Sequence, residues 1–138
     1  MSQKEINEYE DTPNIDTLWA QVGGSATFER IVRRFYDGVK QDPVLSPMYP
    51  QEDWEGAIWR LQHFLEQYWG GPTTYSQNRG HPRLRLRHRP YVINRDARER
   101  WLQHMHAALD AEALPPMADE MFRDYIEKAA LSLTNTPG

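Results

Sequence analysis

Five histidines are the side chains of this sequence best suited to bind a metal: His63, His81, His88, His104 and His106. A neutral imidazole is a common protein ligand of transition metals and also holds haem iron. His88 differs from the others because it follows Leu84 by one helical turn, within a segment bounded by Pro82 and Pro90. A short helix there would place Leu84 and His88 on one face. On the residues alone, a surface or hydrogen-bonded histidine stays open as the alternative.

The other four histidines are weaker candidates. His63 falls off the apolar face of its predicted helix and is expected in solvent. His104 and His106 lie on a helix whose inward positions are already apolar, and His81 precedes a proline in a loop, where it could donate to a carboxylate. A haem site needs one imidazole, apolar and aromatic walls, and cations for two propionates. With five Trp, seven Tyr and four Phe, the chain has the aromatic side chains for such walls.

Other chemistries have less support in the sequence. The chain has no cysteine, which excludes disulfides, iron–sulfur clusters, thiol catalysis and haem attached through Cys-x-x-Cys-His. It also has no glycine-rich phosphate loop, His-Glu-x-x-His helix or Gly-x-Ser-x-Gly turn. The arginines at alternate positions from Arg83 to Arg89 could bind RNA or an acidic partner, or form a solvated surface. A net charge of -4 argues weakly against nucleic acid as the main partner.

The elements that must position these residues are predicted to be helices. Apolar residues recur at helical spacing over residues 18–22, 28–39, 54–68, 97–109 and 121–133. The side chains expected on the inward faces include Tyr68 and Met121. The expected end signals are N-caps at Asp16, Ser25 and Asn94, stops at Gly23-Gly24 and Gly70-Gly71-Pro72, and an opening at Pro115-Pro116.

Two segments are not predicted to form long helices. Residues 42–50 contain three prolines but also Leu45 and Tyr49, which predicts a loop that packs inward. Residues 1–15 are polar and are expected to form a tail without stable structure, followed by one domain over residues 16–138. No stretch alternates like a strand between hairpin turns, and none is apolar for long enough to cross a bilayer. Because the N-terminus lacks the apolar core of a signal peptide, we expect a cytoplasmic, all-α protein.

Longer strings in the sequence carry more information than single residues. They are VGG from Val22, RFYDGV from Arg34, VLSPMYP from Val44, FLEQYWGGPTTYSQNRGHPRLRLRH from Phe64, W at Trp101, and MH from Met105. From about Leu18 to about Asn135, the chain resembles the truncated haemoglobins, and within them group II, the O type. This resemblance implies a shortened globin fold, in which a two-over-two helical sandwich surrounds a haem.

The resemblance also implies a role for each matching position. His88 is the proximal ligand of the iron. On the distal side, the hydrogen-bond donors are Tyr36, Tyr49 and Trp101. Ala57 takes the place at which many globins carry a distal histidine. The remaining residues expected at the haem are Phe35, Leu61, Phe64 and Leu84, with Arg60 and Arg87 approaching the propionates.

The function that follows from the resemblance is reversible binding of oxygen or another small ligand at the open sixth position of haem b. The same distal donors would suit a haem-dependent redox enzyme that reduces peroxide, or oxidises nitric oxide, with an unknown electron donor. The sequence leaves both activities open, together with the choice between a monomer and a homodimer. Neither nucleic acid nor membrane insertion is expected.

Overall fold

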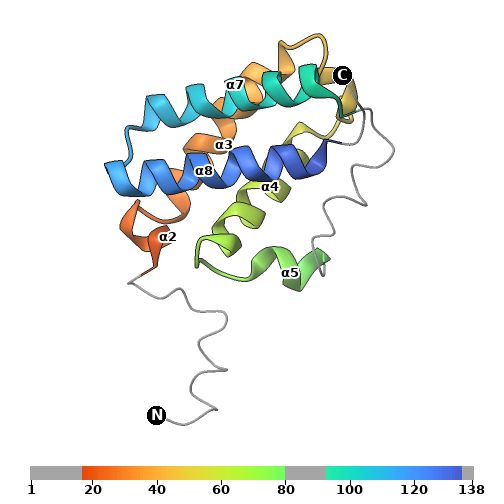
Figure 1. Cartoon of the computed structure of the whole chain (residues 1–138). Coiled ribbons are helices and arrows are strands. Elements are labelled where there is room, and N and C mark those ends of the chain that lie inside the picture. The colour runs from red at the N-terminus through yellow and green to blue at the C-terminus, as the bar shows by residue number, and fades with distance from the viewer. Residues whose placement is uncertain (1–16, 80–92, 135–138) are drawn as a thin grey trace, which may run out of the picture.

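The structure is a computed structural model that describes residues 17–79 and 93–134 of the chain. Every regular element in those ranges is helical (Figure 1), which confirms the predicted all-α class. The elements are α2 (Leu18–Gln21), α3 (Ser25–Lys40), the 3-10 turn η1 (Ser46–Met48), α4 (Trp54–Tyr68), α5 (Thr74–Arg79), α7 (Arg95–Glu112) and α8 (Pro116–Leu133). The predicted tail over residues 1–15 and the short helix expected to carry Leu84, Arg87 and His88 lie outside the described residues.

Helix α3 lies at the centre of the fold because one side of it is apolar along its whole length. Its buried hydrophobic side chains recur every three or four residues and are Phe28, Ile31, Val32, Phe35, Tyr36 and Val39. Helix α3 contacts both α4 and α7, and α7 contacts α8, which gives two layers of two helices (Figure 1). At the crossing with α7, a Cβ on Gly38 would overlap the imidazole ring of His104, so glycine leaves the room that this ring occupies.

A buried carboxylate attaches α2 to the rest of the fold. Glu66 on α4 is only 1% exposed. Trp19 Nε1 donates to its Oε1 over 2.8 Å, Ser25 Oγ donates to the same oxygen, and Gln62 Nε2 donates to Oε2 over 2.9 Å. A buried charge is tolerated when hydrogen-bond donors replace its lost water. Glu66 therefore fixes the start of α3 and the short α2 against α4.

The prediction that His63 is solvated is wrong. Its side chain is 24% exposed, and its Nδ1 lies 3.6 Å from Glu66 Oε2. Its ring centroid is 4.7 Å from that of Trp59, four residues earlier on α4. His63 does lie off the apolar face of the helix, as expected, but two neighbours on the same helix shield it from solvent.

Two of the predicted helix ends differ from those observed. Asp16 lies outside the described residues, and the N-cap of α2 is Thr17, whose Oγ1 accepts from Ala20 N over 3.3 Å. Gly24, with φ at 69°, is the N-cap of α3, and Ser25 is already the first helical residue. The left-handed conformation at the cap favours glycine, and the serine hydroxyl is used by Glu66 instead.

The two remaining signals for helix starts are confirmed. Asn94 caps α7, since its Oδ1 accepts from Ala97 N over 2.9 Å. Pro116 is the first residue of α8, where a missing backbone N–H costs nothing.

Two side chains predicted to face inward are exposed. Met121 is 48% exposed, because the buried stripe of α8 runs along Ala118, Phe122, Ile126 and Ala130. Tyr68 is 50% exposed at the end of α4, although its ring stacks at a tilt against Tyr125 with centroids 3.9 Å apart. Both residues lie at the edge of an apolar face, where helical spacing alone does not separate core from surface.

The sequence did not predict α5. Its residues are polar, and its position is determined by α4: Gln67 Oε1 accepts from Ser76 N over 3.0 Å, and Gln67 Nε2 donates to Ser76 Oγ over 2.7 Å. Among the helices of the described ranges, none is both long and apolar enough to cross a membrane.

Candidate functional site

The described residues surround a cavity of about 510 Å³. Its walls come from α3, α4, α5, α7 and α8, together with residues 45–50. The lining is mostly aliphatic and aromatic, and polar side chains enter it at a few positions. A cavity of this kind is typical of sites for organic cofactors, which have volumes of about 300–1,000 Å³.

Most of the residues predicted to form the site lie around this cavity. The lining includes Tyr36, Tyr49, Ala57, Arg60, Leu61, Phe64 and Trp101. Phe35 is fully buried but does not line the cavity. Its ring packs edge-on behind two residues that do, with centroids 4.9 Å from Tyr36 and 5.0 Å from Trp101. Leu84, Arg87 and His88 lie outside the described residues.

Three hydrogen-bonding side chains from different elements line the cavity. Tyr36 reaches the cavity from α3, Tyr49 from the residue after η1, and Trp101 from α7. The rings of Tyr36 and Tyr49 meet edge-on with centroids 5.5 Å apart. Ala57 on α4 is 3% exposed and contributes only a methyl group to the same cavity.

Burial raises the pKa of the Tyr36 hydroxyl well above its ordinary value. The adjacent Tyr49 raises this pKa further, by its charge and through a hydrogen bond, while the positive charge of Arg60 opposes the shift. Tyr36 is therefore a neutral phenol over the whole physiological pH range and can donate a hydrogen bond. The indole N–H of Trp101 is a donor at any pH.

Trp54 supports the two tyrosines from behind. Its ring centroid lies 6.1 Å from that of Tyr36 and 5.5 Å from that of Tyr49. Lys40 Nζ in turn lies 5.7 Å from the Trp54 centroid, within cation–π distance. The sequence placed Trp54 on an apolar helix face and gave no sign of this contact with the tyrosines.

Three cationic side chains reach the cavity. Arg60 was predicted there, and its Nη1 lies 3.3 Å from Asp53 Oδ2, with the side chain 32% exposed. Arg79 and Arg98 also line the cavity and were not predicted. Arg98 could have been found from the sequence, because it precedes Trp101 by three residues on a predicted helix.

Tyr75 on α5 is another lining residue that sequence reasoning missed. It is 3% exposed, and its ring meets Phe64 edge-on with centroids 5.7 Å apart. No local signal marks it, since its position depends on how α5 packs against α4.

The histidines of the described ranges do not line the cavity. His63 packs against Trp59 beside Glu66. His104 Nε2 donates to Asp42 Oδ2 over 2.8 Å. His106 Nδ1 is 2.9 Å from Arg123 Nη1. These three histidines are therefore not placed as ligands of a group in the cavity, and His81 and His88 lie outside the described residues.

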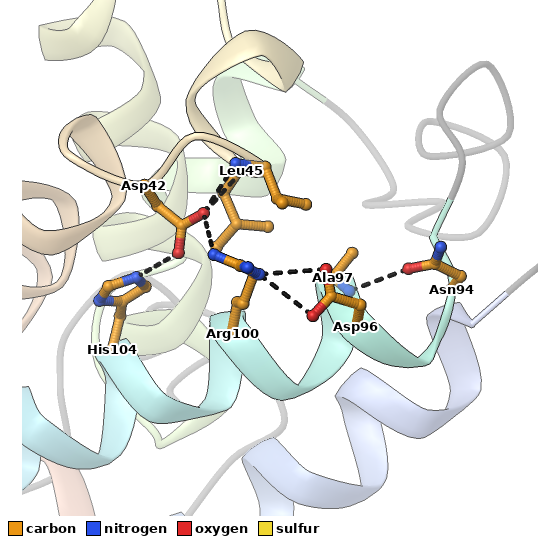
Figure 2. A network of polar contacts seen from close by, with 8 residues as sticks. Asp42, Leu45, Asn94, Asp96, Ala97, Arg100 and His104 are labelled. Carbon is orange, nitrogen blue, oxygen red and sulfur yellow. Dashed lines mark hydrogen bonds and ion pairs between the residues drawn. The ribbon is translucent and has the colours of Figure 1, made fainter. Parts of the chain in front are cut away.

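Asp42 connects the segment after α3 to α7 (Figure 2). Its Oδ1 accepts from Val44 N over 2.9 Å and from Leu45 N over 3.2 Å. From α7, Arg100 Nη1 donates to Oδ1 over 3.2 Å, and His104 donates to Oδ2. Burial alone would raise the pKa of this carboxyl, but these hydrogen bonds and the charge of Arg100 outweigh burial and lower it to about 2.

Replacing Asp42 with Asn is expected to lower the free energy of unfolding by about 2 kcal/mol at pH 7, because hydrogen bonds to a charged group contribute about 1.5–3 kcal/mol. The pKa of Asp42 is lower in the folded chain than its ordinary value of 3.8. The advantage of the native residue is therefore complete above pH 3.8 and is lost as the pH falls through about 2. Urea unfolding of both proteins at several pH values measures it. A stability difference that stays constant down to pH 2.5 would contradict the assignment.

The residues around the cavity fit a haem. Apolar and aromatic walls suit the flat porphyrin, and Arg60, Arg79 and Arg98 are cations of the kind that bind propionates. The donors Tyr36, Tyr49 and Trp101 in the lining suit a small polar ligand of the iron.

Comparison with known proteins also indicates a globin. Residues 17–135 match the bacterial-like globin family. A group 2 truncated haemoglobin of Bacillus subtilis is 35% identical over 112 residues, which cover 81% of this chain and 84% of that protein.

Two solved structures have the same fold. A thermostable haemoglobin from Thermobifida fusca superposes with a TM-score of 0.86 at 54% identity, covering 88% of this chain and 99% of that one. A truncated oxygen-avid haemoglobin from Bacillus subtilis superposes with a TM-score of 0.81 at 31% identity, covering 87% of this chain and 100% of that one. These matches confirm the predicted shortened globin fold, in which α3 and α4 pack across α7 and α8. The chain belongs to the bacterial-like globin family and, within it, to the group II truncated haemoglobins.

Proposed function

We propose that this chain binds haem b through His88 and reversibly binds oxygen or another small ligand at the sixth position of the iron. The observation that carries the proposal is that three hydrogen-bonding side chains, Tyr36, Tyr49 and Trp101, line the same mostly apolar cavity. One of the similar solved structures is a truncated haemoglobin described as oxygen-avid, which supports oxygen as the ligand.

The bound haem would supply an iron with one position open to a diatomic ligand. The protein supplies the rest of the chemistry. The apolar wall from α4 and α8 excludes water, and the methyl group of Ala57 leaves room for a ligand beside the donors. Arg60, Arg79 and Arg98 are placed to bind the propionates.

The distal donors favour a ligand that carries negative charge. Tyr36 and Tyr49 are hydrogen-bonded to each other, so this pair has one phenol proton left to donate to a ligand, and Trp101 can only donate. A hydrogen bond to a charged group contributes about 1.5–3 kcal/mol, so each donor could slow ligand loss by roughly ten- to a hundredfold. Oxygen, which is polarised on ferrous iron, would be retained more strongly than carbon monoxide.

An absorption spectrum of the purified protein tests this proposal directly. We expect a Soret band that shifts when carbon monoxide is added to the reduced protein and returns when the ligand is removed. Reduced protein exposed to oxygen should give a distinct and reversible spectrum. A protein that stays colourless after haem is supplied during expression would contradict the proposal and leave only the fold.

A further inference from the structure

We propose that Asp42 is a positioning residue for the distal donors: it holds residues 42–50, here called the corner, against α7 and so fixes Tyr49 relative to Trp101. The inference rests on the proposed function, because it assigns Asp42 an effect on the ligand through those two side chains. Asp42 itself does not line the cavity.

On one side, Asp42 organises the corner. Its Oδ1 accepts from the backbone amides of Val44 and Leu45, and its own carbonyl accepts from Ser46 N over 2.9 Å. The chain then continues through η1 to Tyr49. Leu45, Met48 and Tyr49 all line the cavity. The Asp42 carboxylate thus fixes the first residues of the corner, and these residues lead the chain to Tyr49.

On the other side, the same carboxylate accepts hydrogen bonds from two residues of α7 that flank Trp101. Arg100 and His104, one residue before and three residues after Trp101, both donate to Asp42 (Figure 2). Residues three and four apart share a helix face, so these two bonds restrict both the rotation and the translation of the turn that carries the indole. Gly38 leaves the room in which the His104 ring lies.

Burial makes this connection rigid. Asp42 is 6% exposed, and both of its carboxylate oxygens are used. Charge-assisted hydrogen bonds are roughly twice as strong as neutral ones, and a buried charge cannot exchange them for water. A shift of the corner away from α7 would break bonds on one side of the carboxylate or the other. Tyr49 and Trp101 are therefore held at a fixed separation across the cavity wall.

Asp42→Asn removes the charge with little change in shape, and Asp96→Asn is the matched control. Asp96 also accepts from Arg100, over 3.1 Å, but it lies on α7 itself, its side chain is 58% exposed, and it does not line the cavity. Both variants are to be examined as haem-loaded protein. One readout is the dissociation rate of oxygen relative to that of carbon monoxide. The other is the C–O stretching band of the carbon monoxide complex, which responds to nearby donors.

In Asp42→Asn we expect oxygen dissociation to accelerate about three- to tenfold relative to carbon monoxide, which lies in the lower part of the range for coupled neighbours. The stretching band should shift or split. Asp96→Asn should change neither readout. In a Tyr49→Phe/Trp101→Phe background, Asp42→Asn should have no further effect, because the donors it positions are gone. A general loss of structure would instead act equally in both backgrounds.

A second variant and a second measurement keep the test decisive if Asp42→Asn folds poorly. His104→Leu removes one of the two bonds from α7 to Asp42 but leaves the Arg100 bond and the corner amides in place, and it should shift the stretching band in the same direction. Amide exchange of Val44 and Leu45 in the haem-loaded protein should be faster in Asp42→Asn and unchanged in Asp96→Asn.

If Tyr49→Phe/Trp101→Phe changes oxygen dissociation while Asp42→Asn and His104→Leu do not, only the role of Asp42 is wrong. If none of them changes it, the proposed distal role of Tyr49 and Trp101 fails as well.

Discussion

A His88→Ala variant is expected to lose stably bound haem, whereas His81→Ala is expected to keep it. The physical reason is the number of imidazoles available to the cavity. His63, His104 and His106 have other partners and do not line it. Of the two remaining histidines, His88 occupies the position that the family resemblance assigns to the proximal ligand. Without that bond, only apolar contacts and propionate pairing would hold the haem.

The measurement is the Soret absorbance per protein after haem-supplemented expression, followed by the rate of haem transfer to an apo-globin acceptor. Adding free imidazole to His88→Ala is the control for folding, because a ligand diffusing into the vacated position should restore the band. Loss of haem in His81→Ala with retention in His88→Ala would reverse the assignment.

Replacing Trp101 with Phe is expected to speed oxygen dissociation about ten- to a hundredfold, which is the value of a hydrogen bond of 1.5–3 kcal/mol to a charged group. Carbon monoxide dissociation should change much less, because that ligand is nearly apolar when bound. The indole N–H donates and never accepts, so removing it affects only a ligand with negative character. Stopped-flow dissociation of both ligands from the native protein and the variant measures the effect.

Comparing the two ligands separates the hydrogen bond from the steric change. Phe retains an aromatic ring against Phe35, which packs 5.0 Å from the indole, but it is smaller and opens the cavity. The extra space should raise the association rates of both ligands alike. Equal acceleration of both dissociation rates would make Trp101 a steric residue, with Tyr36 and Tyr49 as the donors. No effect on either ligand would make it a packing residue only.

The sequence by itself determined the helices whose signals are local. The apolar stripe of α3 repeats every three or four residues, and the observed buried side chains are those that the spacing predicted. Asn94 and Pro116 mark helix starts because a cap and a first-turn proline act within one turn of the chain. The positions of Tyr36, Tyr49 and Trp101 at one cavity came from the family resemblance, since spacing alone allowed each to be an ordinary core residue.

The tertiary structure decided everything that depends on partners distant in sequence. Asp42 and His104 are 62 residues apart, and Trp19 and Glu66 are 47 apart. From the sequence, a carboxylate in a loop or on a polar helix face is expected to be solvated. Only the packing of the helices shows that hydrogen-bond donors surround it. The same is true of α5, which is held by Gln67, and of Tyr75, which reaches the cavity only through α5. Local periodicity reports which face of a helix is apolar, but which side chains meet across two faces depends on how closely the helices approach.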